Sequence, residues 1–386
     1  MRWQHALIGT LLLTGLACGG STTDRPGSAA SWMADSIPLL VLGAASDDTT
    51  QLFGVVVGAT RLPGGDILVA DRQEQTFHLF GSDGVRKRSV GRKGSGPGEF
   101  EYPASFWRCG DSVFVYDIEG YRTSVWSLDL THSRSFQFHA GAQVGGSTPY
   151  ESSCNAAGTF AHYGWEDFRS LPPDGRVFRQ RVPFWIGGPD SSLRLVIDSF
   201  PGSERVLSVD RGSGRITGAG PRMFGKQTSI ALGADRLYIG AAERPEILAV
   251  HLQTLEIDTI ALPWLEAPLT AEDIAARKAV QIAASPPNRR ASIEQVFSDH
   301  PFPETLPPYG ALVVDAEDLL WVQDYPRASS PGVRWTVFSS DGDVVGEAEL
   351  PAHLDVFEIG TDYILGRYID PVEAIPQVRL YALTRN

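Results

Sequence analysis

The chain has 386 residues and a formal net charge of −13, which is long for one ordinary domain but suits a single large all-β domain built from repeats. Its 40 glycines and 26 prolines are typical of many short turns, and an aromatic share of 10% supplies a large core. Because no basic run offsets the acidic excess, nucleic acid is excluded as an expected partner.

The N-terminus predicts an export signal. Arg2 precedes an apolar run over 6–17, which is too short to span a bilayer and typical of a secretory signal. The run ends in Leu16-Ala17-Cys18, which resembles the lipobox of bacterial lipoproteins, although Gly15 stands where that motif prefers an aliphatic residue. We expect a lipoprotein signal peptide over 1–17, a lipid on Cys18 and a flexible tether over 18–35. Cleavage nearby by ordinary signal peptidase is the alternative; in both cases the chain is exported.

Strand patterns recur along the rest of the chain, most of them ending at an acidic or small residue. They are ILVAD ending at Asp71, VFVYD at Asp117, LYIG at Gly240, LLWVQD at Asp324 and YILGRY at Tyr368. The first two ends lie about 46 residues apart, a normal spacing for one four-stranded blade of a β-propeller.

A glycine-rich stretch, GRKGSGPGEF over Gly91–Phe100, separates the first two of these units. It resembles the crossover of NHL-type repeats and of the bacterial six-bladed β-propeller lipoproteins. The stretch superficially resembles a phosphate loop, but no Lys-Ser/Thr pair and no helix pattern follow it. We therefore interpret the glycines as permitting a tight crossover, with Glu99 accepting backbone hydrogen bonds.

The resemblance implies a six-bladed β-propeller of four-stranded antiparallel blades over 36–386. The strand patterns divide this range into blades at about 54–90, 103–138, 148–199, 227–262 and 309–350, followed by a last blade after Pro351. That last blade has only three strand patterns, near 354–359, 362–369 and 377–383. We expect Ile37–Leu42 to supply its fourth strand and so to close the ring, which removes open strand edges.

Loop lengths indicate which face of the propeller carries function. Turns between the first and second, and the third and fourth, strands of each blade are short Gly/Asp turns. The other connections hold nearly every long segment, 200–226 and 263–308 among them, and all lie on the opposite face, here called the long-loop face. Long loops on a rigid scaffold are where such folds place recognition. Trp165, Glu166, Tyr325 and Arg327 are the candidate binding residues of this face.

The insertion at about 263–308, between blades 4 and 5, predicts helices. Thr270-Ala271-Glu272-Asp273 forms a capping box, and Ser292–Phe297 is typical of a second short helix. We expect an apolar side made by Ile274, Ala275, Ala279 and Ile282, with Arg277, Lys278, Arg289 and Arg290 facing solvent. Two interpretations stay open: the insertion covers apolar blade edges, or it shapes a pocket at the propeller mouth.

Two cysteines remain besides Cys18. Cys109 and Cys154 occupy corresponding positions, each at the end of the first strand of its blade, in blades 2 and 3. Because first strands converge toward the propeller axis and the chain is expected to be exported, a disulfide between them is possible. The alternative is a pair of buried free thiols.

No catalytic motif is present, and two classes of function remain. The first is a lipoprotein at the bacterial cell envelope, facing periplasm or cell surface, that binds an unknown protein, peptide or glycan through the long-loop face. It would be a monomer, attached to the membrane only through its lipid. The second is a propeller enzyme, a metal-dependent lactonase or a lyase. No catalytic residue, metal ligand or cofactor is predicted, although Ca²⁺ or Zn²⁺ in the central channel stays open.

Overall fold

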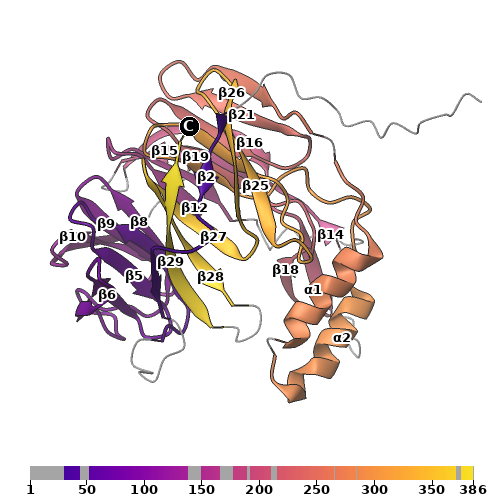
Figure 1. Cartoon of the computed structure of the whole chain (residues 1–386), viewed down its shortest axis with the longest axis horizontal. Helices are drawn as coiled ribbons and strands as arrows, with labels where there is room; N and C mark the ends of the chain where they lie inside the picture. Colours follow the sequence, from indigo (N-terminus) through magenta and orange to yellow (C-terminus); the bar gives the residue numbers. More distant parts are fainter. Residues whose placement is uncertain are drawn as a thin grey trace, which may run out of the picture.

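The structure, a computed structural model, describes residues 30–43, 52–137, 149–165, 177–188, 192–209, 215–264, 266–283, 285–370 and 375–385. Within these ranges six antiparallel sheets follow one another along the chain as propeller blades (Figure 1). Blade 1 holds β4 (Val56–Arg61), β5 (Ile67–Asp71), β6 (Thr76–Phe80) and β7 (Arg86–Val90); blade 2 holds β8 (Pro103–Cys109), β9 (Ser112–Asp117), β10 (Arg122–Ser127) and β11 (His132–Gln137); blade 3 holds β12 (Pro149–Cys154), β13 (Phe160–Gly164), β15 (Arg181–Gly187) and β16 (Leu193–Pro201).

The second half of the ring repeats this plan, and each predicted blade range contains strands of the corresponding blade. Blade 4 holds β19 (Ser229–Leu232), β20 (Arg236–Gly240), β21 (Glu246–His251) and β22 (Ile257–Ala261); blade 5 holds β23 (Leu312–Val314), β24 (Leu320–Gln323), β25 (Gly332–Phe338) and β26 (Val344–Pro351); blade 6 holds β27 (Leu354–Ile359), β28 (Tyr363–Ile369) and β29 (Pro376–Thr384). The first strands contact one another all the way round, β4 with β8, β8 with β12, β12 with β19, β19 with β23, β23 with β27 and β27 with β4. The six-bladed prediction is confirmed.

The N-terminal segment closes the ring. β3 (Leu40–Leu42) pairs antiparallel with β29 and supplies the fourth strand of blade 6, within the predicted Ile37–Leu42. Two shorter strands were not predicted: β2 (Met33–Ala34) also pairs with β29, and β1 (Ala30–Ser31) pairs in parallel with β26 of blade 5. Strands of two residues carry no readable periodicity. The segment therefore joins blades 5 and 6, and in Figure 1 the indigo β2 lies beside the yellow β29.

An acidic residue at the end of the second strand has the same role in blades 1 and 2. The carboxylate of Asp71 accepts the backbone N–H groups of Gly54 and Val55, at 2.7 and 3.1 Å. Asp117 accepts those of Glu101 and Tyr102, at 2.7 and 2.9 Å. Each acid thus satisfies backbone N–H groups of the chain that enters its own blade.

The glycine-rich crossover is structural, as interpreted. Glu99 Oε2 accepts the N–H of Gly96 at 2.9 Å, and Arg92 Nε donates to Oε1 at 2.7 Å. The Gly96 hydrogen bond, then Arg92, lowers the pKa of Glu99. Gly94 and Gly98 have φ of +150° and +75°, which side-chain-bearing residues rarely adopt. The crossover ends at a buried Phe100, stacked on Trp126 with ring centroids 5.9 Å apart.

The face opposite the long-loop face, which carries the short Gly/Asp turns, is here called the short-turn face. On it every pair of neighbouring blades is joined by a hydrogen bond or a disulfide. In order, Arg108 Nε donates to Thr60 Oγ1 at 3.0 Å, Cys109 is joined to Cys154, Asn155 Nδ2 donates to the Gly233 carbonyl at 3.0 Å, Ala234 N to Asp318 Oδ1 at 2.7 Å, Ala316 N to the Ile359 carbonyl at 3.0 Å, and Thr60 Oγ1 to Glu358 Oε2 at 2.6 Å. These bonds form a closed belt of inter-blade contacts at one end of the channel.

The segment over 200–226 was expected as a loop, and this is wrong. It forms a hairpin of β17 (Arg205–Val209) and β18 (Ile216–Pro221), joined by β14 (Val177–Phe178) into a three-stranded sheet of its own. Two glycines and a terminal proline in β18 give a weak strand signal, and β14 is too short to show one. This extra sheet stands on the long-loop face beside the helices (Figure 1).

The insertion folds into α1 (Ala271–Ala283), a 3₁₀ turn η3 (Pro287–Arg289) and α2 (Arg290–Asp299). The predicted capping box is confirmed: Asp273 N donates to Thr270 Oγ1 at 3.2 Å, and Thr270 N donates to Asp273 Oδ2 at 3.0 Å. The predicted apolar side is wrong in part, since Ala275 and Ala279 are exposed, whereas Lys278 is half-buried. No helix in the described part of the chain is long and apolar enough to cross a membrane.

Candidate functional site

A pocket of about 620 Å³ opens on the long-loop face. Its walls come from the segments that lead into β19 and β23, the loop after β24, the end of β18 and helix α1. Its inner side is formed by first-strand residues of three blades, Ser229, Leu312 and Val356. The pocket therefore lies at the blade 4–6 side of the channel mouth, where the loop lengths predicted recognition, and its volume is typical of a small-molecule site.

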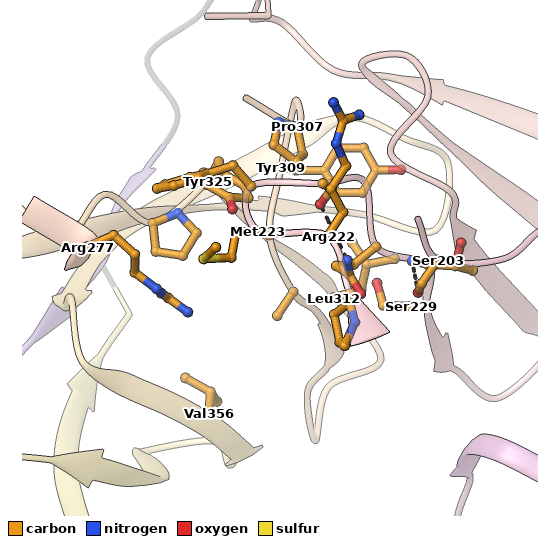
Figure 2. Close-up of a pocket in the computed structure, with 18 of the residues that line it drawn as sticks. Ser203, Arg222, Met223, Ser229, Arg277, Pro307, Tyr309, Leu312, Tyr325 and Val356 are labelled. Atoms are coloured by element: carbon orange, nitrogen blue, oxygen red, sulfur yellow. Dashed lines mark hydrogen bonds between the residues drawn. The ribbon is translucent and has the colours of Figure 1, made fainter. Parts of the chain in front are cut away.

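The lining is mostly apolar and aromatic. Tyr163, Met223, Phe224, Tyr309 and Tyr325 provide the larger side chains (Figure 2). Arginine is the only charged residue type in the lining, at Arg222 and Arg277, and none of the described lining residues is acidic. In a chain with 46 acidic residues, this is a local reversal of charge.

Arg222 is held by the walls of the pocket. Its Nε donates to the Pro301 carbonyl at 2.8 Å, and NH1 contacts Glu204 Oε2 at 3.3 Å. The Glu204 carboxylate thus neutralises this cation locally, and the contact with Pro301 ties the end of β18 to the chain that leaves α2.

Arg277 is an exposed residue on α1. Among the described residues, no carboxylate lies within ion-pairing distance of its guanidinium. The nearest acid along its helix face, Asp273, is one turn away and is occupied: Arg327 NH1 contacts its two carboxylate oxygens at 3.0 and 2.9 Å. Burial raises the pKa of Asp273, but the hydrogen bonds from Thr270 and the Arg327 charge outweigh this and hold the pKa below its usual value.

Ser229 adds a second polar feature. Its hydroxyl oxygen is buried and has no hydrogen-bond partner within the described ranges. Figure 2 shows Arg277 on one flank of the pocket and Ser229 on the other, with Met223 between them. Buried polar groups in native proteins are nearly always satisfied, so this hydroxyl is an exception among the groups near the pocket.

Two tyrosines of the lining, Tyr309 and Tyr325, stay neutral. Burial raises the pKa of Tyr325, although the Arg277 charge works against this. Burial also raises the pKa of Tyr309, whose hydroxyl accepts the Ala242 N–H at 2.7 Å and donates to the Glu246 carbonyl at 3.2 Å. Both rings therefore act as uncharged walls.

The wall over 221–225 is fixed to the insertion. Met223 N donates to His300 Nε2 at 2.9 Å, so this ring nitrogen carries no proton. Phe224 has a φ of +55°, an unusual conformation for a non-glycine residue, and its ring lies 6.0 Å from that of Phe302. The helical insertion thus forms a fixed wall of the pocket, which favours the pocket-shaping interpretation over simple edge cover.

The structure places the four predicted binding residues differently. Tyr325 lines the pocket. Arg327 is not among the lining residues, because its guanidinium is bound to Asp273. Trp165 is also outside the lining, and its Nε1 donates to the Pro149 carbonyl at 3.1 Å. Glu166 lies outside the described residues. Arg277 was expected to face solvent, and it is exposed; its additional place in the pocket lining follows from how the helix is oriented.

Cys109 and Cys154 form a disulfide on the short-turn face, with Cα atoms 5.9 Å apart. Corresponding positions in neighbouring blades are near enough for this bond. It lies away from the pocket and belongs to the belt. In the described part of the chain, no group of three or more His, Cys, Asp or Glu residues could hold a metal ion.

Comparison with known proteins supports the fold. Residues 50–139 match a protein-family model described as a 6-bladed beta-propeller. No curated protein matches the sequence. Among solved structures, the chain is similar to a member of the duf4221 family from Bacteroides vulgatus (12% identity, TM-score 0.48, 93% of this chain and 98% of that chain), to the calcium-binding protein regucalcin from Agrobacterium tumefaciens (10%, 0.46, 93% and 98%) and to virginiamycin B lyase from Staphylococcus aureus (12%, 0.40, 89% and 83%). Likenesses at this level carry no argument about ligand or activity.

Proposed function

We propose that this protein is a ligand-binding β-propeller lipoprotein of the bacterial cell envelope, and that its ligand enters the pocket on the long-loop face. The apolar run before Cys18 supports export and lipid attachment. The pocket itself carries the binding proposal, because it offers about 620 Å³ of space. Its walls are side chains from several blades and the helical insertion, which is held by the Arg327–Asp273 ion pair and by the hydrogen bond from Met223 N to His300.

The second class, a propeller enzyme, has less support. General acid–base catalysis needs a titratable group within hydrogen-bond reach of the substrate. The lining described for this pocket has no carboxylate, histidine, cysteine or lysine, and the pKa values of Tyr309 and Tyr325 are raised. Binding is the function that these side chains favour.

A pocket-filling substitution tests the proposal. Ala328 lines the pocket from a turn after β24, so Ala328→Trp would occupy its space without changing charge. The probe is phenylnaphthylamine, an uncharged aromatic molecule that fluoresces in apolar surroundings. We expect the wild-type protein to bind it and the Trp variant, folded by circular dichroism, to lose most of this binding. Equal binding by both proteins, or none by the wild type, would overturn the proposal.

A further inference from the structure

The charge of the pocket points to the class of ligand. We infer that the pocket takes a mostly apolar molecule with one oxyanion, such as a carboxylate or sulfonate, and that Arg277 binds this anion. This inference rests on the proposed function and narrows it. The ligand charge is then negative and lies at the Arg277 side of the pocket.

The first argument is local electrostatics. The chain as a whole has a net charge of −13, yet the described lining has no acidic side chain. Arg222 is already neutralised by Glu204. Among the described lining residues, Arg277 is therefore the cation whose charge is available to a ligand. A guanidinium binds carboxylates and related oxyanions through paired N–H donors.

The second argument is that neighbouring groups keep Arg277 available. An acid one helical turn away would ordinarily attract it, but the Asp273 carboxylate binds Thr270 and Arg327 instead. That carboxylate is buried, with its side chain 4% exposed, and it accepts from two other residues. The ion pair between Arg327 and Asp273 thus leaves the positive charge of Arg277 at the pocket edge.

The third argument concerns the rest of the ligand. Between Arg277 and Ser229 the lining is apolar, with Met223, Leu312 and Val356 presented by three separate segments (Figure 2). Apolar walls favour a hydrocarbon or aromatic body and strengthen the attraction between the guanidinium and an anion held beside them.

Two fluorescent probes separate charge from shape. Anilinonaphthalene sulfonate and phenylnaphthylamine share the same rings, and only the first carries an anion. We expect Arg277→Gln to weaken binding of the sulfonate about tenfold or more, the usual effect of losing a hydrogen bond to a charged group, and to change phenylnaphthylamine binding much less, because that probe carries no anion. Arg277→Lys keeps the charge but loses the paired N–H donors, so its sulfonate affinity should lie between those of the wild type and of Arg277→Gln. Added salt should weaken sulfonate binding to the wild type more than to Arg277→Gln.

Arg290→Gln is the matched control, because Arg290 is an exposed arginine of the same insertion that does not line the pocket. It should leave both affinities unchanged. If both probes bind and are lost in Ala328→Trp, but Arg277→Gln does not change sulfonate affinity, the anionic ligand class is wrong and the proposed function stands. If neither probe binds the wild type, or binding survives Ala328→Trp, the proposed function fails and this inference fails with it.

Discussion

Arg327 binds both carboxylate oxygens of Asp273, at 3.0 and 2.9 Å, and so fastens the first turn of α1 to the loop after β24. The Asp273 side chain is 4% exposed and that of Arg327 is 36% exposed. This pair was not anticipated, because Arg327 and Asp273 are far apart in the sequence. It makes the helical insertion part of the pocket wall and not a detached flap.

Removing this arginine should loosen the insertion. Arg327→Leu leaves a buried carboxylate with one partner fewer, at a cost of about 1–3 kcal/mol. The loss should be local, so hydrogen exchange over 271–299 should accelerate and the affinity for the fluorescent probes should fall. The strands of the six blades should keep their protection from hydrogen exchange. Arg334→Leu, which breaks the more exposed pair with Asp324, is the control and should leave exchange in the insertion unchanged. Unchanged exchange in Arg327→Leu would show that other contacts hold the helix.

The N-terminal segment should be essential for stability. Trp32 is buried, its ring lies 5.3 Å from that of Trp321, and the guanidinium of Arg385 lies 4.8 Å from it. Trp32→Ala should lower the free energy of unfolding by about 3–5 kcal/mol, measured by urea denaturation. Met33→Ala, at an exposed neighbour, should cost little. A truncation that begins after Leu42 should lose cooperative unfolding, because blade 6 then exposes the edge of β29. If it melts like the full chain, the closure is dispensable.

The fold could be predicted because local signals agree with one another. Asp71 and Asp117 mark the end of the same strand in two blades, and the structure gives both the same hydrogen bonds. The capping box at Thr270 is equally local and was read correctly. Short strands such as β1 and β14 were missed, because two residues owe their structure to a neighbouring strand and not to their own pattern.

The sequence indicated the face on which the pocket lies, but not most of the residues that line it. Loop lengths indicated the long-loop face, and Tyr325 was placed there. Arg277 was expected to face solvent and is exposed. That it also lines the pocket could not be predicted, because helical periodicity gives the relative positions of side chains but not which neighbours the helix meets. Ser229 and Met223 carry no motif at all. Their role follows from chain segments that meet only in the tertiary structure.

Lipid attachment at Cys18 is a separate prediction, on a residue outside the described ranges. Mass spectrometry of the mature protein should find an acylated Cys18 at its N-terminus, because the apolar run ends in Ala17-Cys18. Cys18→Ser should move the protein from the membrane fraction to the soluble fraction. A mature chain that begins elsewhere with an unmodified residue would show that ordinary signal peptidase processes it.

The disulfide should stabilise the belt. Cys109 and Cys154 are separated by 45 residues, and the chain-entropy model gives roughly 3–4 kcal/mol for a loop of this length. Thiol titration of the unreduced, denatured protein should find neither of these two thiols free. The double variant Cys109→Ala, Cys154→Ala should unfold at a lower urea concentration than the oxidised wild type and match the reduced wild type. Equal stability of oxidised and reduced protein would contradict the prediction.

A buried histidine should make stability depend on pH. Burial lowers the pKa of His162 from 6.5 to about 3, and its Nδ1 lies 2.6 Å from the Ser152 hydroxyl oxygen. In the unfolded chain this ring takes up a proton near its ordinary pKa, while in the folded protein it does so only near pH 3. Between these two values the unfolded state binds more protons, so the free energy of unfolding falls as the pH falls, by up to about 1.4 kcal/mol per pH unit.

This contribution should disappear in a variant without the imidazole. His162→Phe with Ser152→Ala removes both hydrogen-bonding groups and keeps an aromatic ring between Phe160 and Trp185, whose ring centroids lie 5.9 and 5.4 Å from that of His162. Urea denaturation from pH 7 to pH 4 should give a smaller slope for this variant than for the wild type, whereas Ser152→Ala alone should keep the wild-type slope. Carboxylates that titrate in the same range are common to all three proteins and cancel in the comparison. Parallel slopes for the wild type and the double variant would mean that the folded protein accepts a proton on His162 as readily as the unfolded chain does.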